Sequence, residues 1–315
     1  MGQCACLREE PASGVATFCM NSVTIQVPGT TSNIGPGFDC LGIALALHNR
    51  MTVTRDSAGA LSVEPAHAML RECARMFFRR TNVPEFGFKW SVTGDVPVSR
   101  GLGSSVTIRL GILAALNELS GRPLKQEGLF ALCSEIEGHP DNAAPAAFGG
   151  FVLTNAHGET FRFEVEARLK FVLLIPDMEV LTEHARRVLP PSIAHREAVL
   201  NIGNACTITA AFATGEYERL RDCFGDALHQ PYRAHLVPGL FEIIESGVNA
   251  GALGGFLSGS GSTICCLALA DQAPAVASAM RATWKGEAAA AIHIVTADNN
   301  GASVVQPQDL TSDAS

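Results

Sequence analysis

Charged residues are scarce in this sequence, and basic residues are scarcer than acidic ones. Only 17% of the 315 residues are charged, whereas 47% are hydrophobic, and an intrinsically disordered chain shows the opposite composition. The 23 Lys and Arg residues against 31 Asp and Glu residues leave a net charge of −8. Because a protein that neutralises nucleic-acid phosphates needs an excess of basic residues, we exclude a nucleic-acid partner and expect an acidic, soluble globular protein.

Long uninterrupted hydrophobic runs are also missing. The longest stretch without a charged residue, residues 246–270, contains six glycines, and such a segment would leave backbone groups unsatisfied in lipid. Arg8, Glu9 and Glu10 interrupt the N-terminus before an apolar export segment develops. The ten cysteines contain no CxxC spacing, which favours buried, reduced thiols over disulfides or a metal site. We therefore expect a cytoplasmic protein with no membrane partner.

Several familiar catalytic motifs are absent as well. The chain contains no GxxxxGK[ST] phosphate loop, no GxSxG nucleophile elbow and no HExxH metal motif. No GxGxxG segment follows a strand and precedes an acidic residue at the distance that a dinucleotide-binding fold requires. These absences exclude the Walker-type nucleotide-binding proteins, the α/β-hydrolases and the zinc peptidases, and they leave dinucleotide enzymes with little support.

Hydrophobic periodicity predicts strands and helices that do not alternate strictly, which favours an α+β fold over a doubly wound sheet. The predicted strands cover residues 22–27, 43–55, 86–93, 150–155, 160–165, 170–176, 254–258, 263–269 and 290–296. The predicted helices cover residues 66–80, 104–120, 125–137, 183–188, 196–214, 240–248 and 274–284. We expect domains at 21–165 and 166–298, a poorly ordered extension at 1–20 (or a true start at Met20), and a flexible tail at 299–315.

Three clusters of small residues each lie beside an apolar segment, at residues 28–39, 97–105 and 257–263. In the second cluster, Gly101 and Gly103 permit positive φ, and Ser104 and Ser105 stand where a helix N-cap is expected. The N–H groups and dipole at a helix start favour an anion. The cluster therefore has the properties of a phosphate cradle, although an ordinary glycine turn with a serine cap explains it equally well.

The sequence Pro97-x-x-x-Gly-Leu-Gly-Ser-Ser105 resembles the ATP-binding motif of the GHMP small-molecule kinases, and the other two clusters occur in the order of that superfamily. Further stretches resemble the homoserine kinase family, namely residues 27–42, 137–145 with 148–150, 182–190, and 231–239. The resemblance covers residues 22–296. It implies a two-domain fold, with an N-terminal domain of the ribosomal-S5-domain-2 type and a C-terminal ferredoxin-like domain. ATP and the substrate would meet in the cleft between them.

The resemblance implies an enzyme that uses ATP and Mg²⁺ to phosphorylate the side-chain hydroxyl of L-homoserine, in threonine biosynthesis. The positions that would hold the nucleotide are Pro97, Arg100, Gly101, Leu102, Gly103, Ser104, Ser105, Ser258, Gly259, Ser260 and Gly261. The metal would lie between the Ser105 hydroxyl and the Glu137 carboxylate, since Mg²⁺ takes one or two oxygen ligands from protein beside phosphate. Glu135 is the alternative acidic ligand.

The resemblance also implies a set of substrate-pocket residues, which are Asn33, Asp39, His139, Asn142, Thr182, Arg186 and Arg233. Asp39 would pair with the substrate ammonium, and the two arginines would hold its carboxylate. The residues expected to act in catalysis are Asn33, Asp39, His139 and Asn142. Either Asp39 or His139 fits the role of general base. Asp141 fits the N-cap of a helix over residues 142–147.

Two alternatives stay open from the sequence. Another GHMP kinase, for mevalonate-like or sugar substrates, should lack the two arginines in their present context. A non-catalytic regulator on the same fold should have a degraded phosphate loop, whereas residues 101–105 are intact. Val106 and Thr107 depart from the very small residues usual after this loop, and Gly29 stands where alanine is common, but none of these removes a charge or donor. A homodimer is left open.

Overall fold

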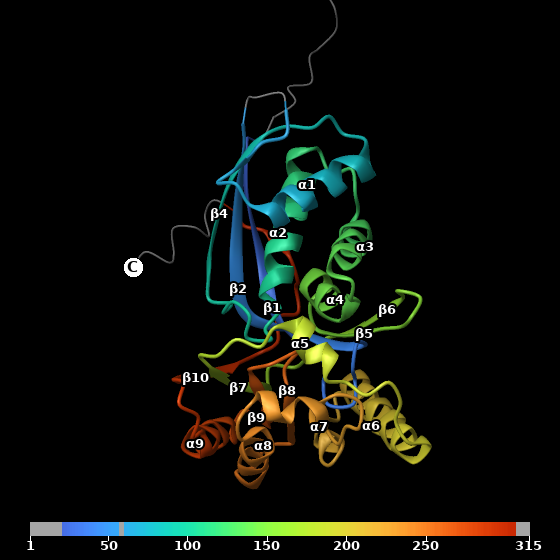
Figure 1. Cartoon of the computed structure of the whole chain (residues 1–315), viewed down its shortest axis with the longest axis vertical. Helices are drawn as coiled ribbons and strands as arrows, with labels where there is room; N and C mark the ends of the chain where they lie inside the picture. Colours follow the sequence, from blue (N-terminus) through green and yellow to red (C-terminus); the bar gives the residue numbers. More distant parts are fainter. Residues whose placement is uncertain (1–20, 57–59, 307–315) are drawn as a thin grey trace, which may run out of the picture.

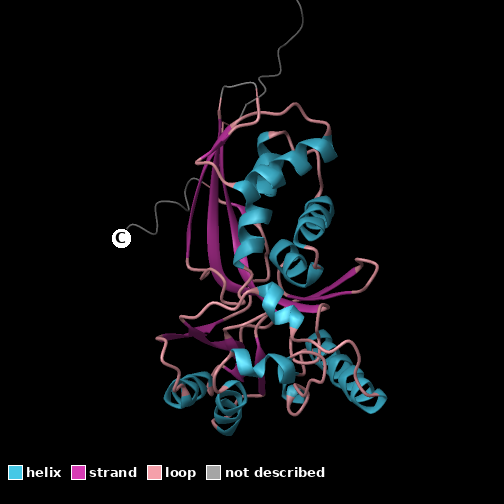
Figure 2. Cartoon of the chain, in the orientation of Figure 1, coloured by secondary structure: helices cyan, strands magenta, loops and turns pink. Residues whose placement is uncertain are grey.

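The computed structural model describes residues 21–56 and 60–306, so the expected N-terminal extension at residues 1–20 lies outside it. Within the described residues, the chain forms two sheets placed one above the other along the longest axis (Figure 1). Helices gather on one side of the upper sheet and beneath the lower sheet (Figure 2). The mixed α+β architecture predicted from the sequence is confirmed.

The first sheet is built around a long central strand. Its strands are β1 (Ser22–Ser32), β2 (Leu41–Arg55), β3 (Val63–Glu64), β4 (Phe88–Gly94), β5 (Phe151–Thr154), β6 (Thr160–Phe163) and β11 (Ser303–Val304). The helices that cover one face are α1 (Ala68–Thr81), α2 (Ser104–Leu119), α3 (Gln126–Glu137) and α4 (Pro140–Phe148). The start of β2 pairs with β5 and its later part with β4, so β2 connects the two parts of this sheet.

The second sheet has two differently covered faces. Its strands are β7 (Leu169–Pro176), β8 (Gly254–Leu257), β9 (Ile264–Leu269) and β10 (Ala290–Val295), in the antiparallel order β10-β7-β9-β8. The helices around it are α5 (Thr182–Arg187), α6 (His195–Thr214), α7 (Gln230–Arg233), α8 (Leu240–Asn249) and α9 (Ala273–Thr283). Single turns of 3-10 helix lie at Tyr217–Leu220 and Ala234–Leu236.

The alternating side chains of β7 divide the apolar interior between these faces, as the period of two in a strand requires. Val172 and Leu174 pack in a cluster with residues of α8 and α9. Phe171 and Leu173 face the other way and share a cluster with Ile43 of the first sheet and with α6. The two sheets therefore share one buried apolar layer at their junction.

After the last strand of the second sheet, the chain returns to the first sheet. Ser303 and Val304 form β11, which pairs with Ile25 and Gln26 of β1, so the predicted flexible tail from residue 299 is wrong for residues 299–306. The Asp298 carboxylate explains the ordered turn: it receives hydrogen bonds from the backbone N–H groups of Asn300 and Gly301 and contacts the His48 ring at 2.7 Å. Burial would raise the pKa of Asp298, but these partners lower it overall.

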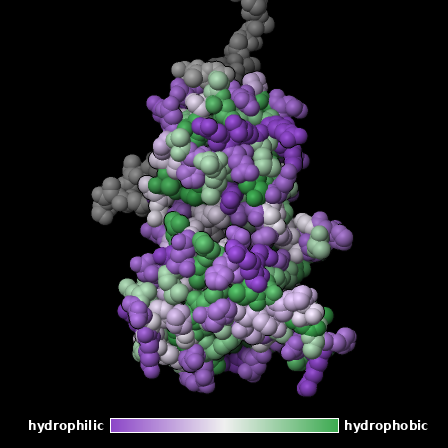
Figure 3. Space-filling model, in the orientation of Figure 1, coloured by the Kyte–Doolittle hydropathy of each residue, from purple (hydrophilic) through white to green (hydrophobic). Residues whose placement is uncertain are grey.

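The described residues contain no helix that is both long and apolar enough to cross a membrane. Hydrophilic residues are spread over both halves of the face seen in Figure 3. The chain passes from the first sheet to the second between Phe163 and Leu169, close to the domain boundary that the sequence predicts at residue 165. The division into domains itself stays a prediction, because the chain later returns to the first sheet.

Candidate active site

The three clusters of small residues, far apart in the sequence, meet where the two sheets join. Backbone hydrogen bonds tie them together: Thr30 N–H donates to Leu102 (3.1 Å), and Gly259 N–H donates to Ser32 (3.0 Å). The Ser258 hydroxyl donates to the Gly101 carbonyl at 2.6 Å. A Cβ at Gly101 would lie 2.2 Å from the Ser258 carbonyl oxygen, so only glycine allows this approach.

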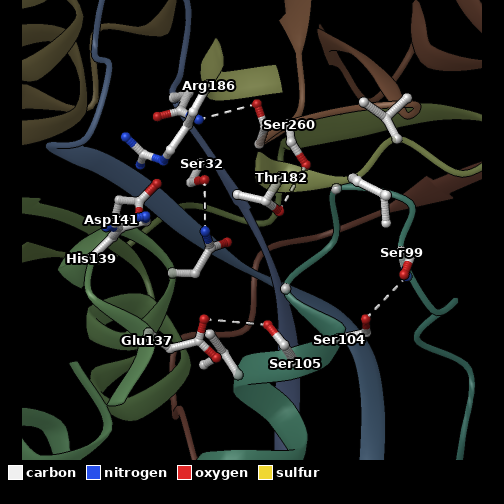
Figure 4. Close-up of a pocket in the computed structure, with 18 of the residues that line it drawn as sticks. Ser32, Ser99, Ser104, Ser105, Glu137, His139, Asp141, Thr182, Arg186 and Ser260 are labelled. Carbon is white, nitrogen blue, oxygen red and sulfur yellow. Dashed lines mark hydrogen bonds between the residues drawn. The ribbon is translucent and has the colours of Figure 1, made fainter. Parts of the chain in front are cut away.

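A cavity of about 210 Å³ opens beside this junction (Figure 4). It lies between the first turn of α2, the start of α4, the N-terminal end of α5 and the loop at residues 259–260. The predicted site residues that line it are Asn33, Gly101, Gly103, Ser104, Ser105, Glu137, His139, Asn142, Thr182, Arg186, Arg233, Gly259 and Ser260. The structure therefore brings together residues from all the motifs that the sequence singled out.

The first turn of α2 points its unpaired N–H groups toward this cavity. Gly103 is the N-cap, with φ 66° in the left-handed region, and its carbonyl accepts the first helical hydrogen bond from Thr107 at 3.0 Å. Ser104 is therefore the first helical residue and not the cap, and its hydroxyl accepts a hydrogen bond from the Ser99 N–H. Since N–H groups in a first turn have no intrahelical partner, this end can receive an anion.

Glu137 lies at the same end of the cavity, at the last residue of α3. The Ser105 hydroxyl donates to its Oε2 at 3.4 Å, and Arg109 forms an ion pair with its other oxygen. Glu135 instead forms an ion pair with Arg80 on the exposed surface, so of the two acidic candidates only Glu137 reaches the cavity. Within the described residues no cluster of three or more His, Cys, Asp or Glu could hold a metal on its own.

A carboxylate and a guanidinium dominate the opposite end of the cavity. Arg186 donates two hydrogen bonds to Asp39, from Nη1 to Oδ2 at 3.0 Å and from Nη2 to Oδ1 at 2.6 Å. The remaining donor, Nε of Arg186, is buried and has no hydrogen-bond partner among the described residues. A buried donor without a partner is costly, so this nitrogen is suited to an anionic acceptor supplied by a ligand.

Arg233 is the second cation at this end and is almost completely buried. Its Nε donates to the Ala185 carbonyl at 2.9 Å and its Nη1 to the Gly259 carbonyl at 3.1 Å. Burial lowers the pKa of Arg233 to about 10, and the charge of Arg186 acts in the same direction. Arg233 is nevertheless protonated at neutral pH, so two positive charges converge on this part of the cavity.

Two asparagine side chains connect the ends of the cavity. Asn33, at φ 58°, accepts a hydrogen bond from the Asp39 N–H and donates to the Gly259 carbonyl. The Asn142 amide accepts from the Thr30 hydroxyl at 2.7 Å and donates to the Ser32 hydroxyl at 2.9 Å. Each amide therefore has a fixed orientation, which is what positioning of a substrate hydroxyl requires.

Asp141 lines the cavity and does not cap a helix, in contrast to the role predicted from the sequence. The N-cap of α4 is His139, without a side-chain capping bond, and Asp141 is the second helical residue. Its carboxylate is buried in the wall of the cavity (Figure 4). Burial raises the pKa of Asp141, partly offset by a hydrogen bond to Ser32. The only sequence signal was its place between His139 and Asn142, two residues already assigned to the pocket.

The remaining predicted residues lie around the cavity instead of in its wall. Arg100 forms an ion pair with Asp177, and Leu102 is buried in the shared apolar cluster. Those outside the lining set are Asp39, Pro97, Arg100, Leu102, Ser258 and Gly261; Asp39 reaches the cavity through its hydrogen bonds with Arg186. At the cavity wall, the Thr182 and Ser260 hydroxyls approach each other to 3.4 Å. Val106, one of the two larger residues that follow the glycine loop, also lines the cavity.

A second cavity of about 510 Å³ adjoins the first and was not predicted. The two share Ser99, Ser104 and Ser105. The walls of the second are mainly apolar and aromatic, with His67 and Trp90 in an edge-to-face arrangement. The sequence feature that could have indicated this cavity is Trp90, a large aromatic residue within the predicted strand at residues 86–93.

Comparisons with known proteins agree with this geometry. Residues 68–150 match the GHMP kinases N terminal domain, and residues 208–286 match the GHMP kinases C terminal domain. The chain is 38% identical over 300 residues to the homoserine kinase of Microchaete diplosiphon, covering 90% of this chain and 97% of that protein. It is 39% identical over 280 residues to that of Trichormus variabilis, covering 84% and 93%.

A solved structure gives the same result. The crystal structure of homoserine kinase from Cytophaga hutchinsonii superimposes with a TM-score of 0.84 at 25% identity, covering 94% of this chain and 100% of that one. The fold class expected from the sequence is thereby confirmed. The chain belongs to the homoserine kinase family of the GHMP kinases.

Proposed function

We propose that the described cavity is where this kinase transfers the γ-phosphate of ATP to the side-chain hydroxyl of L-homoserine. The observation that carries the assignment is the buried, unpaired Nε of Arg186 beside the Asp39 carboxylate. Homoserine is a zwitterion, with a carboxylate for the arginines and an ammonium for Asp39. A substrate placed against the Asp39–Arg186 pair gives each of the four charges an opposite neighbour, which an uncharged sugar cannot do.

The nucleotide would lie across both cavities. Its phosphates would meet the first-turn N–H groups of α2, and its adenosine would occupy the adjoining cavity, against Trp90 and His67. Support for this placement comes from Ser104 and Ser105, which line both cavities. An aromatic wall next to an anion-binding helix start matches the two parts of ATP.

Mg²⁺ fits the residues at the start of α2. The Ser105 hydroxyl and the Glu137 carboxylate are hard oxygen donors from different helices, 3.4 Å apart. Since Mg²⁺ keeps several waters and uses phosphate oxygens, these two protein ligands are sufficient. When bound, the ion would neutralise charge on the phosphates, and the protein residues would hold the phosphates in line with the hydroxyl.

Three groups can accept the hydroxyl proton: His139 and Asp141, which line the cavity, and Asp39, which pairs with Arg186 of its wall. Asp39 is engaged by two hydrogen bonds from Arg186, which reduces its capacity as a base. Burial raises the pKa of Asp141, so its carboxylate binds a proton more strongly than an ordinary aspartate. Asp141 is therefore a candidate acceptor beside His139, both in the cavity wall, and the adjacent Asn142 would orient the hydroxyl.

The direct test measures ADP release by the purified protein with ATP and Mg²⁺ over a panel of acceptors. Homoserine should give the highest kcat/KM, followed distantly by serine and threonine, whose hydroxyls lie closer to the α-carbon. Mevalonate and galactose should give no ADP above background, because they lack the ammonium that faces Asp39. Equal turnover of galactose and homoserine would contradict the substrate assignment.

Replacing Glu137 with glutamine should raise the Mg²⁺ concentration needed for half-maximal activity by about tenfold. The control is Glu135→Gln, which should leave the Mg²⁺ titration unchanged because Glu135 pairs with Arg80 on the surface. Ser105→Ala keeps the Arg109–Glu137 ion pair and should shift the titration in the same direction as Glu137→Gln. An unchanged titration for both cavity variants would place the metal elsewhere.

A further inference from the structure

Phe38, immediately before Asp39, lies against both arginines of the cavity. The Cζ atom of Arg233 lies 5.1 Å from the centre of its ring, and the Cζ atom of Arg186 lies 5.4 Å from the same point. We propose that Phe38 is a positioning residue, whose aromatic ring holds these two guanidinium groups together so that both reach one substrate carboxylate. The inference rests on the proposed function, because it takes the carboxylate to be that of homoserine.

The guanidinium groups of Arg186 and Arg233 repel each other, so their close approach needs a stabilising neighbour. The charge of Arg186 contributes to the lowered pKa of Arg233, which is the electrostatic signature of their repulsion. Asp39 binds Arg186 by direct hydrogen bonds. Arg233 donates to two neutral carbonyls, and the charges of Asp39, Asp226 and Asp141 favour its protonated form. The negative face of an aromatic ring attracts a cation at this distance. Phe38 therefore supplies attraction to both cations without adding a competing carboxylate.

His229 fixes the ring of Phe38 in turn. The two rings are stacked, with centroids 5.3 Å apart and an interplanar angle of 27°. Nε2 of His229 lies 2.8 Å from the Gly35 carbonyl and so carries a proton, while Nδ1 lies 3.4 Å from Nη1 of Arg233 and accepts. Burial lowers the pKa of His229, so the ring is neutral and adds no third positive charge to the cavity.

Loss of the Phe38 ring should weaken the binding of homoserine and leave the binding of ATP unchanged. An aliphatic side chain at position 38 fills similar space but has no negative ring face, so the two guanidinium groups lose a common partner. The affinity for the substrate carboxylate should fall. The start of α2, which would bind the phosphates, lies at the other end of the cavity from the arginines. The KM for homoserine should therefore rise while the KM for ATP stays constant.

The test compares wild type with Phe38→Leu, using homoserine and 3-aminopropan-1-ol, which is homoserine without its carboxylate. In Phe38→Leu, the KM for homoserine should rise about tenfold, with kcat and the KM for ATP within about twofold of wild type. The inhibition constant of 3-aminopropan-1-ol against homoserine should stay unchanged, because this compound does not use the arginines. A merely damaged cavity would weaken both compounds.

Two further variants complete the design. Phe38→Tyr keeps the aromatic face and should restore most of the homoserine affinity. Phe163→Leu removes another half-buried ring, in β6 and outside the cavity wall, and should leave all constants unchanged. Equal losses for homoserine and 3-aminopropan-1-ol in an active enzyme would overturn the role of Phe38 alone. Absence of homoserine phosphorylation by the wild type would overturn the proposed function, and the inference with it.

Discussion

Replacing Gly103 with alanine should lower the affinity for ATP by about 100-fold, as measured by calorimetric titration of the folded variant. A Cβ at this position would lie 2.1 Å from Oγ1 of Thr30, and the backbone has φ +66°, which L side chains rarely adopt. Strain of about 1–3 kcal/mol must then be relieved by moving the N-cap of α2, which is the part that faces the phosphates. A change of this size corresponds to about fivefold to 150-fold in binding, and the close contact with Thr30 puts the variant toward the upper end.

The matched control is Gly121→Ala, just beyond the other end of α2. Its φ is +79°, but a Cβ there meets nothing within 4 Å. This variant should lose about 1–2 kcal/mol of stability and keep wild-type ATP affinity. Because Thr30 also donates to Asn142, Gly103→Ala should disturb the substrate side as well. Wild-type ATP affinity in folded Gly103→Ala would mean that the nucleotide phosphates do not bind at the start of α2.

Arg186→Ala should raise the KM for homoserine by about 100-fold, since truncating one partner of a close charge pair typically costs 2–5 kcal/mol. The KM for ATP should stay within about twofold of wild type, because only the amino acid has an α-carboxylate. Steady-state ADP release with each substrate varied in turn measures both constants. The variant also loses the ion pair between Arg186 and Asp39, and Asp39 is the carboxylate that would bind the substrate ammonium.

The neighbouring arginine provides the control. Arg187 pairs with Glu183 one helical turn away, and both side chains are largely exposed, at 69% and 82%. Exposed pairs of this kind contribute little, so Arg187→Ala should leave both KM values unchanged. A similar rise in KM for both arginine variants would indicate a general effect on α5 and would refute the assignment of Arg186 to the carboxylate.

Arg233 is a poorer choice for the same experiment. Its side chain is only 1% exposed and satisfies the carbonyls of Ala185 and Gly259. Removing it would leave these two acceptors unpaired and a cavity in their place, so loss of folding would accompany loss of binding. The buried position is itself informative, because a fully desolvated guanidinium binds a carboxylate more strongly than an exposed one.

Much of the fold was predictable because it depends on local patterns. The period of two in β1, the nearly continuous apolar run of β7 and the apolar spacing in α2 each appear in the sequence, and their observed bounds lie within a few residues of the predicted ones. β1 extends to Ser32, five residues beyond its predicted end, because Gly29 to Ser32 pair with β2 across an irregularity. The two residues of β3 and of β11 are too short to show a period, so pairing with distant strands alone defines them.

The site was predictable only where family motifs supplied the positions. No local pattern shows that Asp39 pairs with Arg186, 147 residues away, or that Phe38 lies against two arginines. Such contacts depend on how the two sheets pack. Asp141 was misassigned because an aspartate before a helix usually caps it, whereas here α4 begins earlier and turns that carboxylate inward. The roles of the site residues, the cytoplasmic location and a homodimer stay predictions.

The return of the chain to β1 through β11 has a consequence for biosynthesis. The edge strand of the first sheet is among the last described segments to be synthesised, although β1 is the first. Until residues 298–304 have been made, the edge of β1 has no partner, and an open edge is a template for wrong pairing with other chains. A product that stops after the second sheet would therefore contain every residue of the cavity and still expose a strand edge prone to aggregation.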